Sequence, residues 1–134
     1  MMPLLTGVLL ALATAIGGWV VGFTRERGFF PVVLIVIATY NLLFAVMADS
    51  PGTLRPELDA AIVFLALAVA GYKRSLWLVA LGLFAHGVFD AFHGRLIANP
   101  GVPEFWPAFC AGYDLAFAAC LSLLLASGAQ PPSR

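Results

Sequence analysis

Five long apolar segments constrain the fold of this chain more than any other feature. They cover approximately residues 4–23, 29–48, 56–72, 75–97 and 104–126. About 20 apolar residues are needed for a helix to cross the hydrocarbon core of a bilayer, and all but the third segment reach that length comfortably. Lipid cannot satisfy unpaired backbone N–H and C=O groups, so each spanning segment must be helical. The pattern predicts an all-α bundle of five transmembrane helices.

The balance of apolar and charged residues argues against a soluble protein. Hydrophobic residues make up 62% of the chain and charged residues 10%, whereas soluble domains carry about 25% charged residues. The formal net charge is zero, which predicts no nucleic-acid partner and leaves the lipid bilayer as the main one. The third segment approaches spanning length only if it begins near Pro56, and it can still span if Glu57 and Asp59 lie in the headgroup region.

Both ends of the chain allow a prediction. The first 22 residues resemble a secretory signal, but a basic leader is missing and the apolar run continues to Phe23, which favours a first transmembrane helix. The segment 127–134 is predicted to be a disordered tail. Cys110 and Cys120 fall about 15 Å apart along one helix, too far to form a disulfide, so both are expected to be free thiols.

The loops predict an orientation for the bundle. Five basic residues fall on one side of a five-helix arrangement: Arg25, Arg27, Lys73, Arg74 and Arg134. Two others, Arg55 and Arg95, fall on the opposite side. The positive-inside rule then places the N-terminus outside and the C-terminus in the cytoplasm, which we assign to a bacterial inner (plasma) membrane.

A GxxxG spacing at Gly18 and Gly22 marks a helix face that can approach another helix closely. Packing within the bundle is the favoured interpretation, because glycine is common in membrane helices. A homo-oligomer formed through this face is the alternative.

The stretch 85–94 carries both histidines of the chain and an aspartate inside an apolar segment. His86, Asp90 and His93 follow at i, i+4 and i+7, which places the three side chains on one face of a helix. Ionisable groups within a membrane are costly and face the bundle interior or a water-filled cavity. This face is therefore expected to point inward.

Depth brings polar residues of two other helices to the same level. Counted at the helical rise, Asp114 lies about 15 Å from the outer end of the fifth helix, close to the level of His86. Asn41 lies about 10 Å from the outer end of the second, level with Asp90. We expect Asn41, Asp90, His93, His86 and Asp114 to surround an outward-opening cavity between helices two, four and five.

Two aromatic residues lie along the same part of the fifth helix. Trp106, Cys110 and Asp114 follow at i, i+4 and i+8, which places them on one line of the helix. Tyr113 lies beside that line and offers a hydroxyl group. Trp106 and Tyr113 are therefore candidate ligand-binding residues.

A metal ion is one use for this group. Imidazole and carboxylate are common ligands of Zn and Fe. His86 and His93 lie about 10.5 Å apart along the axis, so one ion could bind both only with strain. A divalent ion held by Asp90, Asp114 and one histidine fits better, and two ions would use both histidines.

Three other uses remain open. Asp90 and Asp114 could act as catalytic acid and base without a metal, with His86 or His93 as proton carrier. The polar residues could serve a small transporter or channel. They could also do no more than hold the helices in register. We favour a membrane-embedded site that binds or transforms a small or lipid-soluble molecule, whether or not a metal assists.

The strings Ala85–Gly94, Asn99–Pro107 and Tyr113-Asp114 resemble a family of small bacterial multi-pass integral membrane proteins of unknown function. The likeness covers the last two helices. It implies a membrane location and implies that His86, Asp90, His93, Trp106 and Asp114 belong together. The pairing of HxxxDxxH with an aspartate in the next helix is also similar to that in membrane hydrolases that hold zinc through histidines and an aspartate.

Overall fold

The computed structural model describes residues 1–128, and in this range the chain forms five α-helices and one short 3-10 turn. The helices are α1 (Met2–Val21), α2 (Phe29–Met47), α3 (Pro51–Lys73), α4 (Leu76–Leu96) and α5 (Trp106–Ala126), and the turn η1 spans Phe23–Arg25. The all-α prediction is confirmed. Most of the tail predicted to be disordered, residues 127–134, lies outside the described residues.

Local sequence explains where several helices begin and end. Gly22 ends α1 with φ of 89°, a left-handed conformation that glycine adopts without strain. The hydroxyl of Ser75 accepts from the backbone N–H of Trp77 and caps the start of α4. Pro51 occupies the first turn of α3, where its missing N–H costs nothing. This helix begins earlier than the predicted start near Pro56, which it includes.

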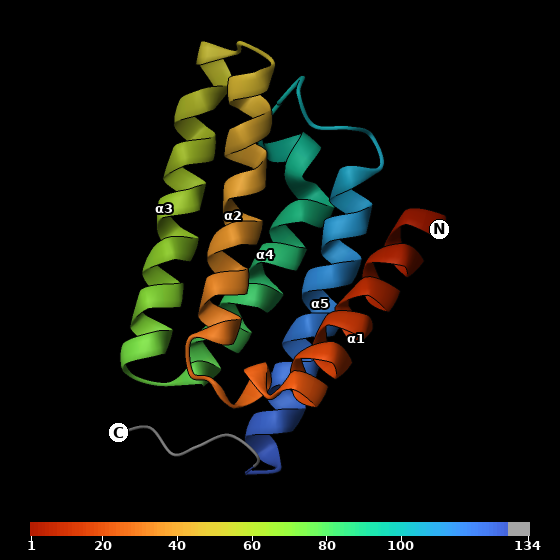
Figure 1. Cartoon of the computed structure of the whole chain (residues 1–134). Coiled ribbons are helices and arrows are strands. Elements are labelled where there is room, and N and C mark those ends of the chain that lie inside the picture. Colours follow the sequence, from red (N-terminus) through yellow and green to blue (C-terminus); the bar gives the residue numbers. More distant parts are fainter. Residues whose placement is uncertain (129–134) are drawn as a thin grey trace.

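Consecutive helices run in opposite directions, so α1 and α5, which pack side by side, run in the same direction (Figure 1). The close helix pairs are α2 with α3, α3 with α4, α4 with α5, and α5 with α1. Figure 1 shows the N-terminal part of α1 leaning away from α2 while it stays against α5. A cleft between α1 and α2 follows from this splay, with α5 as its floor.

Four of the five helices, α1, α2, α4 and α5, are long and apolar enough to cross a membrane. Large hydrophobic side chains on the outside of the bundle are exposed, as on lipid-facing helices; they include Leu9, Ile16, Val36, Val63 and Leu123. The chain is therefore a membrane protein. Charges in α3 lower its hydropathy, and one of them, Glu57, is buried between the helices.

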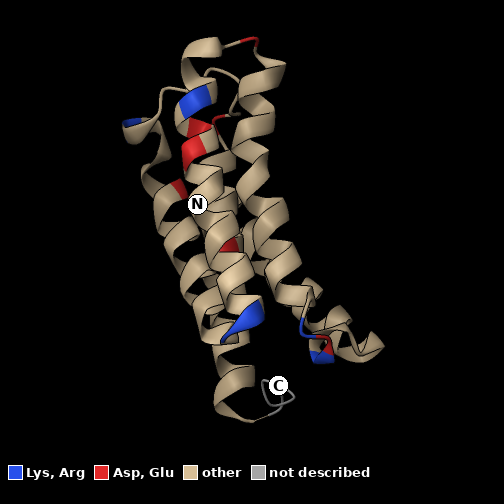
Figure 2. Ribbon diagram, turned by 90° about the vertical axis from the view of Figure 1, so that its left-hand side faces the viewer, with Lys and Arg blue, Asp and Glu red and all other residues tan. Residues whose placement is uncertain are grey.

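The buried side chains are apolar toward the end of the bundle where α2 and α4 begin, and polar side chains join them toward the other end, which is the upper one in Figure 1. Large side chains fill the lower half and make a continuous core; they include Phe30, Leu34, Leu83, Phe117 and Leu121. Buried polar side chains lie nearer the upper ends of α2 to α5, with Thr24 below them. Figure 2 shows charged residues concentrated toward both ends of the bundle, with acidic residues continuing into the upper half.

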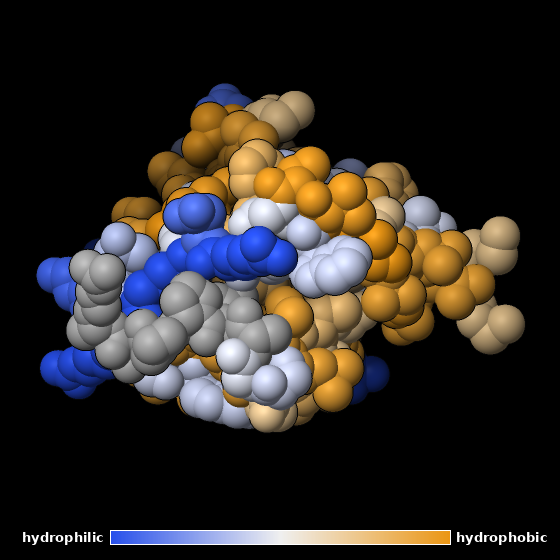
Figure 3. All heavy atoms as spheres, turned by 60° about the horizontal axis from the view of Figure 1, so that its bottom comes forward, coloured by the Kyte–Doolittle hydropathy of each residue, from blue (hydrophilic) through white to orange (hydrophobic). Residues whose placement is uncertain are grey.

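The lower end of the bundle carries basic side chains from two loops. Seen from this end, hydrophilic surface gathers beside an apolar flank (Figure 3). Arg27 donates from Nε to the backbone carbonyl of Tyr72 at 2.6 Å. A basic group at the C-terminal end of a helix satisfies carbonyls that have no partner within the helix. Arg27 therefore ties the loop after α1 to the end of α3.

Helix α1 approaches α5 so closely that only glycine fits at the contact. A Cβ on Gly7 would lie within 2.0 Å of the backbone oxygen of Phe109, and one on Gly112 within 2.3 Å of that of Leu4. Gly18, by contrast, faces Phe29 and Thr24 of the same chain, which is packing within the bundle. An oligomer through the Gly18 and Gly22 face stays a prediction.

We expect Gly7→Ala to destabilise the bundle by about 1–3 kcal/mol, because the added methyl group must separate two backbones. Reversible unfolding in mixed micelles measures the effect. Gly17→Ala is the matched control on the same helix, since nothing lies within 4 Å of its added Cβ. Equal stability of the two variants would contradict the close α1–α5 contact.

Candidate functional site

Two carboxylates and one imidazole meet at the centre of the polar half. Nδ1 of His86, on α4, lies 2.7 Å from Oδ2 of Asp114 on α5 and 3.4 Å from Oδ2 of Asp90 one helical turn away. One ligand atom from each residue lies within 4.8 Å of the other two. The three side chains form what we call the His–Asp cluster, and each of them is at most 2% exposed.

Asn41 of α2 orients the cluster from outside. Its amide Nδ2 donates to Oδ1 of Asp90 at 3.0 Å, which fixes that carboxylate and leaves its other oxygen toward His86. Two carboxylate oxygens, Oδ2 of Asp90 and Oδ1 of Asp114, are buried and lack a hydrogen-bond partner among the described residues. Buried polar atoms are seldom left unsatisfied, so these two call for an explanation.

A second polar group lies nearer the loops at the same end. Nε2 of His93 is 2.8 Å from Oε1 of Glu57, and Nδ2 of Asn99 donates to the same oxygen at 2.7 Å. Asn99 also donates to the backbone carbonyl of Asn41 at 2.9 Å. Three helices and a loop are therefore held together by Glu57, His93 and Asn99, which we call the outer lock.

The loop of residues 97–105 covers the site. Oδ1 of Asn99 accepts from the backbone N–H of Gly101 at 3.1 Å. A Cβ on Gly101 would lie within 2.1 Å of the backbone oxygen of Phe44, so glycine is needed for the loop to rest on α2. The sequence predicted an outward-opening cavity, whereas Asp90 and Asp114 are almost fully buried.

Helical spacing correctly predicted that four residues would come together, but it did not predict two other residues of the polar half, Glu57 and Asn99. Asn41, Asp90, His86 and Asp114 come together, but His93 turns instead toward Glu57. Neither Glu57 nor Asn99 was among the predicted site residues. The signal for Glu57 was present: with Asp59 two residues away, the two acids point to different sides of the helix, so one of them can face inward.

Trp106 and Tyr113 form no hydrogen bond with the His–Asp cluster in the described part of the chain. Both line the cleft between α1 and α2, together with Thr14, Tyr40 and Cys110. The thiol of Cys110 lies close to Asp90 and Asp114, so this residue adjoins both the cleft and the cluster. Cys110 and Cys120 are both free, as predicted.

The His–Asp cluster has the dimensions of a metal site. Ligand atoms of a tetrahedral zinc ion lie about 2.0–2.1 Å from it and therefore about 3.3 Å from one another. The distance of 3.4 Å between Nδ1 of His86 and Oδ2 of Asp90 already fits, and that of 2.7 Å to Asp114 must open. The shorter distance is that of a hydrogen bond, which a proton on His86 would make.

Three protein ligands leave one position of a tetrahedral ion free, which is the arrangement of catalytic rather than structural zinc sites.

Comparison with protein-family models, with curated proteins and with solved structures gives no match. The function therefore has to be inferred from the residues themselves.

Proposed function

We propose that this membrane protein binds one divalent cation, of the zinc type, through His86, Asp90 and Asp114, and that the ion acts on a small or lipid-soluble molecule. The observation that supports this proposal is the convergence of three buried ligand atoms within 4.8 Å. A metal at this position would polarise a carbonyl group or lower the pKa of a bound water.

Charge favours a cation at the cluster. Asp90 and Asp114 have His86 as their only ion-pair partner among the described residues. Two ionised carboxylates and a protonated His86 leave one negative charge in a medium where an unbalanced charge costs several kcal/mol. A divalent ion with neutral His86 gives a net charge of zero and uses a carboxylate oxygen that has no partner.

A polar seam that only packs helices is the competing account. It explains the outer lock, where Glu57 accepts two hydrogen bonds. Partnerless oxygens do not separate the two accounts, because Oε2 of Glu57 in the outer lock is also buried without a partner among the described residues. The metal is favoured instead by the convergence of three ligand atoms within 4.8 Å at the His–Asp cluster. A channel is less well supported, because below the cluster Thr24 is the only buried polar side chain in the described part of the chain.

Metal titration tests the proposal. Purified protein, stripped with a chelator and returned to nanodiscs, is titrated with Zn²⁺ against a chromophoric chelator of known affinity. One tight site per chain is expected. If the stripped protein competes no better for Zn²⁺ than empty nanodiscs, the metal proposal fails and the polar seam is favoured.

Asn41→Leu is expected to weaken zinc binding about 10–100-fold without removing the site, because loss of a hydrogen bond to a ligand typically has that effect. The same titration measures the change. Thr39→Val, a nearby substitution on the exposed side of α2, is the control and should bind zinc like the parent. An unchanged affinity in Asn41→Leu would show that Asn41 does not orient a metal ligand.

A further inference from the structure

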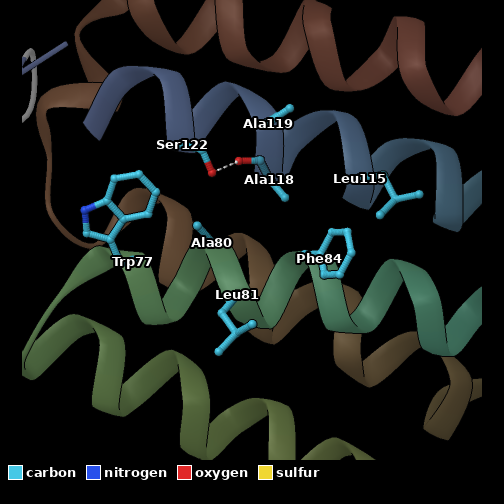
Figure 4. A pocket seen from close by; sticks show the side chains of 8 residues that line it. All are labelled: Trp77, Ala80, Leu81, Phe84, Leu115, Ala118, Ala119 and Ser122. Carbon is cyan, nitrogen blue, oxygen red and sulfur yellow. Dashed lines mark hydrogen bonds between the residues drawn. The ribbon is translucent and has the colours of Figure 1, made fainter. Parts of the chain in front are cut away.

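Two cavities on the sides of the bundle differ in their polar groups. One, of about 600 Å³, lies between α4 and α5 and is lined mainly by apolar side chains and small alanines (Figure 4). Its polar side chain, Ser122, donates its hydroxyl to the carbonyl of Ala118 at 2.8 Å (Figure 4). Nothing there distinguishes a ligand from an ordinary lipid chain.

The cleft between α1 and α2 has a different lining. Its volume is about 390 Å³, at the small end of the range for ligand pockets. Apolar side chains from three membrane-spanning helices form its walls, among them Leu10, Val36 and Phe109. No lysine, arginine, aspartate or glutamate lines it. An occupant must therefore be uncharged, small and soluble in lipid.

One wall of the cleft carries hydrogen-bonding groups. The indole N–H of Trp106 is buried and has no hydrogen-bond partner within residues 1–128, which the structure describes. Tyr40 packs edge-on against the Trp106 ring, with centroids 5.1 Å apart, and Tyr113 lies on the same side of α5. An indole N–H can only donate, so the group that satisfies it must be an acceptor, such as a carbonyl oxygen.

We propose that the cleft between α1 and α2 binds an uncharged, lipid-soluble molecule by its carbonyl or ether oxygen, with Trp106 as hydrogen-bond donor and the apolar part of the molecule between Leu10 and Val36. The ligand enters sideways from the bilayer, because α1 and α2 diverge. Cys110 lines the cleft and also lies close to Asp90 and Asp114. The cleft goes beyond the metal site and needs no metal for binding.

Equilibrium binding of radiolabelled undecyl methyl ketone to the protein in phospholipid nanodiscs tests the proposal, with empty nanodiscs as background. We expect saturable binding of one molecule per chain. Tridecane, which has the same chain length without the oxygen, should compete at least tenfold more weakly, as expected for loss of one hydrogen bond. Equal competition by tridecane would overturn the role of the oxygen. Absence of saturable binding would overturn the proposal. The same result is expected if bilayer phospholipid fills the cleft, so that outcome also counts against it.

Variants on α2 provide the matched comparison. Val36→Phe places a larger side chain in the cleft and should abolish ketone binding, whereas Val46→Phe, on an exposed position outside it, should not. Trp106→Phe keeps the ring but removes the donor and should weaken binding about tenfold. Zinc titration of Val36→Phe should match the parent, so failure of the cleft and failure of the metal site are distinguishable. Ketone binding that survives Val36→Phe would contradict this location.

Discussion

His86→Ala is expected to lower the affinity of the protein for Zn²⁺ by at least a thousandfold. The substitution removes the nitrogen ligand and leaves two carboxylates, which hold a zinc-type ion less well than a set that includes an imidazole. Asp114→Asn should act in the same direction, because a neutral amide is a poor ligand for a divalent ion. Competition with a chromophoric chelator measures both effects in the same nanodiscs.

His93→Gln provides the control for that experiment. His93 is as buried as His86 and lies on the same helix, but its partner is Glu57 and not a carboxylate of the His–Asp cluster. Its loss should change zinc affinity little and keep the stoichiometry at one. A large loss of affinity in His93→Gln, or none in His86→Ala, would assign the metal to a different set of ligands.

Glu57→Leu should produce the largest loss of stability among single substitutions in the polar half, about 3–5 kcal/mol in the free energy of unfolding. The change removes the acceptor of His93 and of Asn99 at once. It also frees the loop of residues 97–105 from α3. Unfolding in mixed micelles, followed by circular dichroism, gives the difference from the parent.

Asp59→Leu is the matched substitution on α3. Asp59 pairs with Arg55 at 3.7 Å on the surface, with 63% of its side chain exposed, and exposed ion pairs contribute about 0–1 kcal/mol. A comparable loss in both variants would mean that the burial of Glu57 does not stabilise the bundle. If Glu57→Leu folds and binds zinc like the parent, the outer lock and the metal site are independent of each other.

Much of the fold could be predicted because membrane helices obey a simple length rule. The predicted spans match α1, α2, α4 and α5 within a few residues. The start of α3 was missed because Pro56 reads as a helix start, whereas the helix begins at Pro51 and contains Pro56 in its interior. The glycines at the α1–α5 contact could be recognised in the sequence, but the helix that each one packs against could not be inferred from spacing alone.

The site was predictable where depth along a helix decides position. Asp114 and His86 meet because both lie at the same level, and Asn41 meets Asp90 for the same reason. Rotation of α3 about its axis, which turns Glu57 inward, depends on packing that no pattern in the sequence fixes. Asn99 was missed because a loop residue has no periodicity, and its two donated hydrogen bonds follow only from the path of the loop.

X-ray absorption at the zinc edge of the loaded protein tests the central claim most directly. The account predicts a first shell of nitrogen and oxygen atoms at about 2.0–2.2 Å, with the scattering pattern of a single imidazole. That pattern should disappear in His86→Ala. A shell with sulfur at about 2.3 Å, which would indicate Cys110, or one with two imidazoles, would contradict a site made by His86, Asp90 and Asp114.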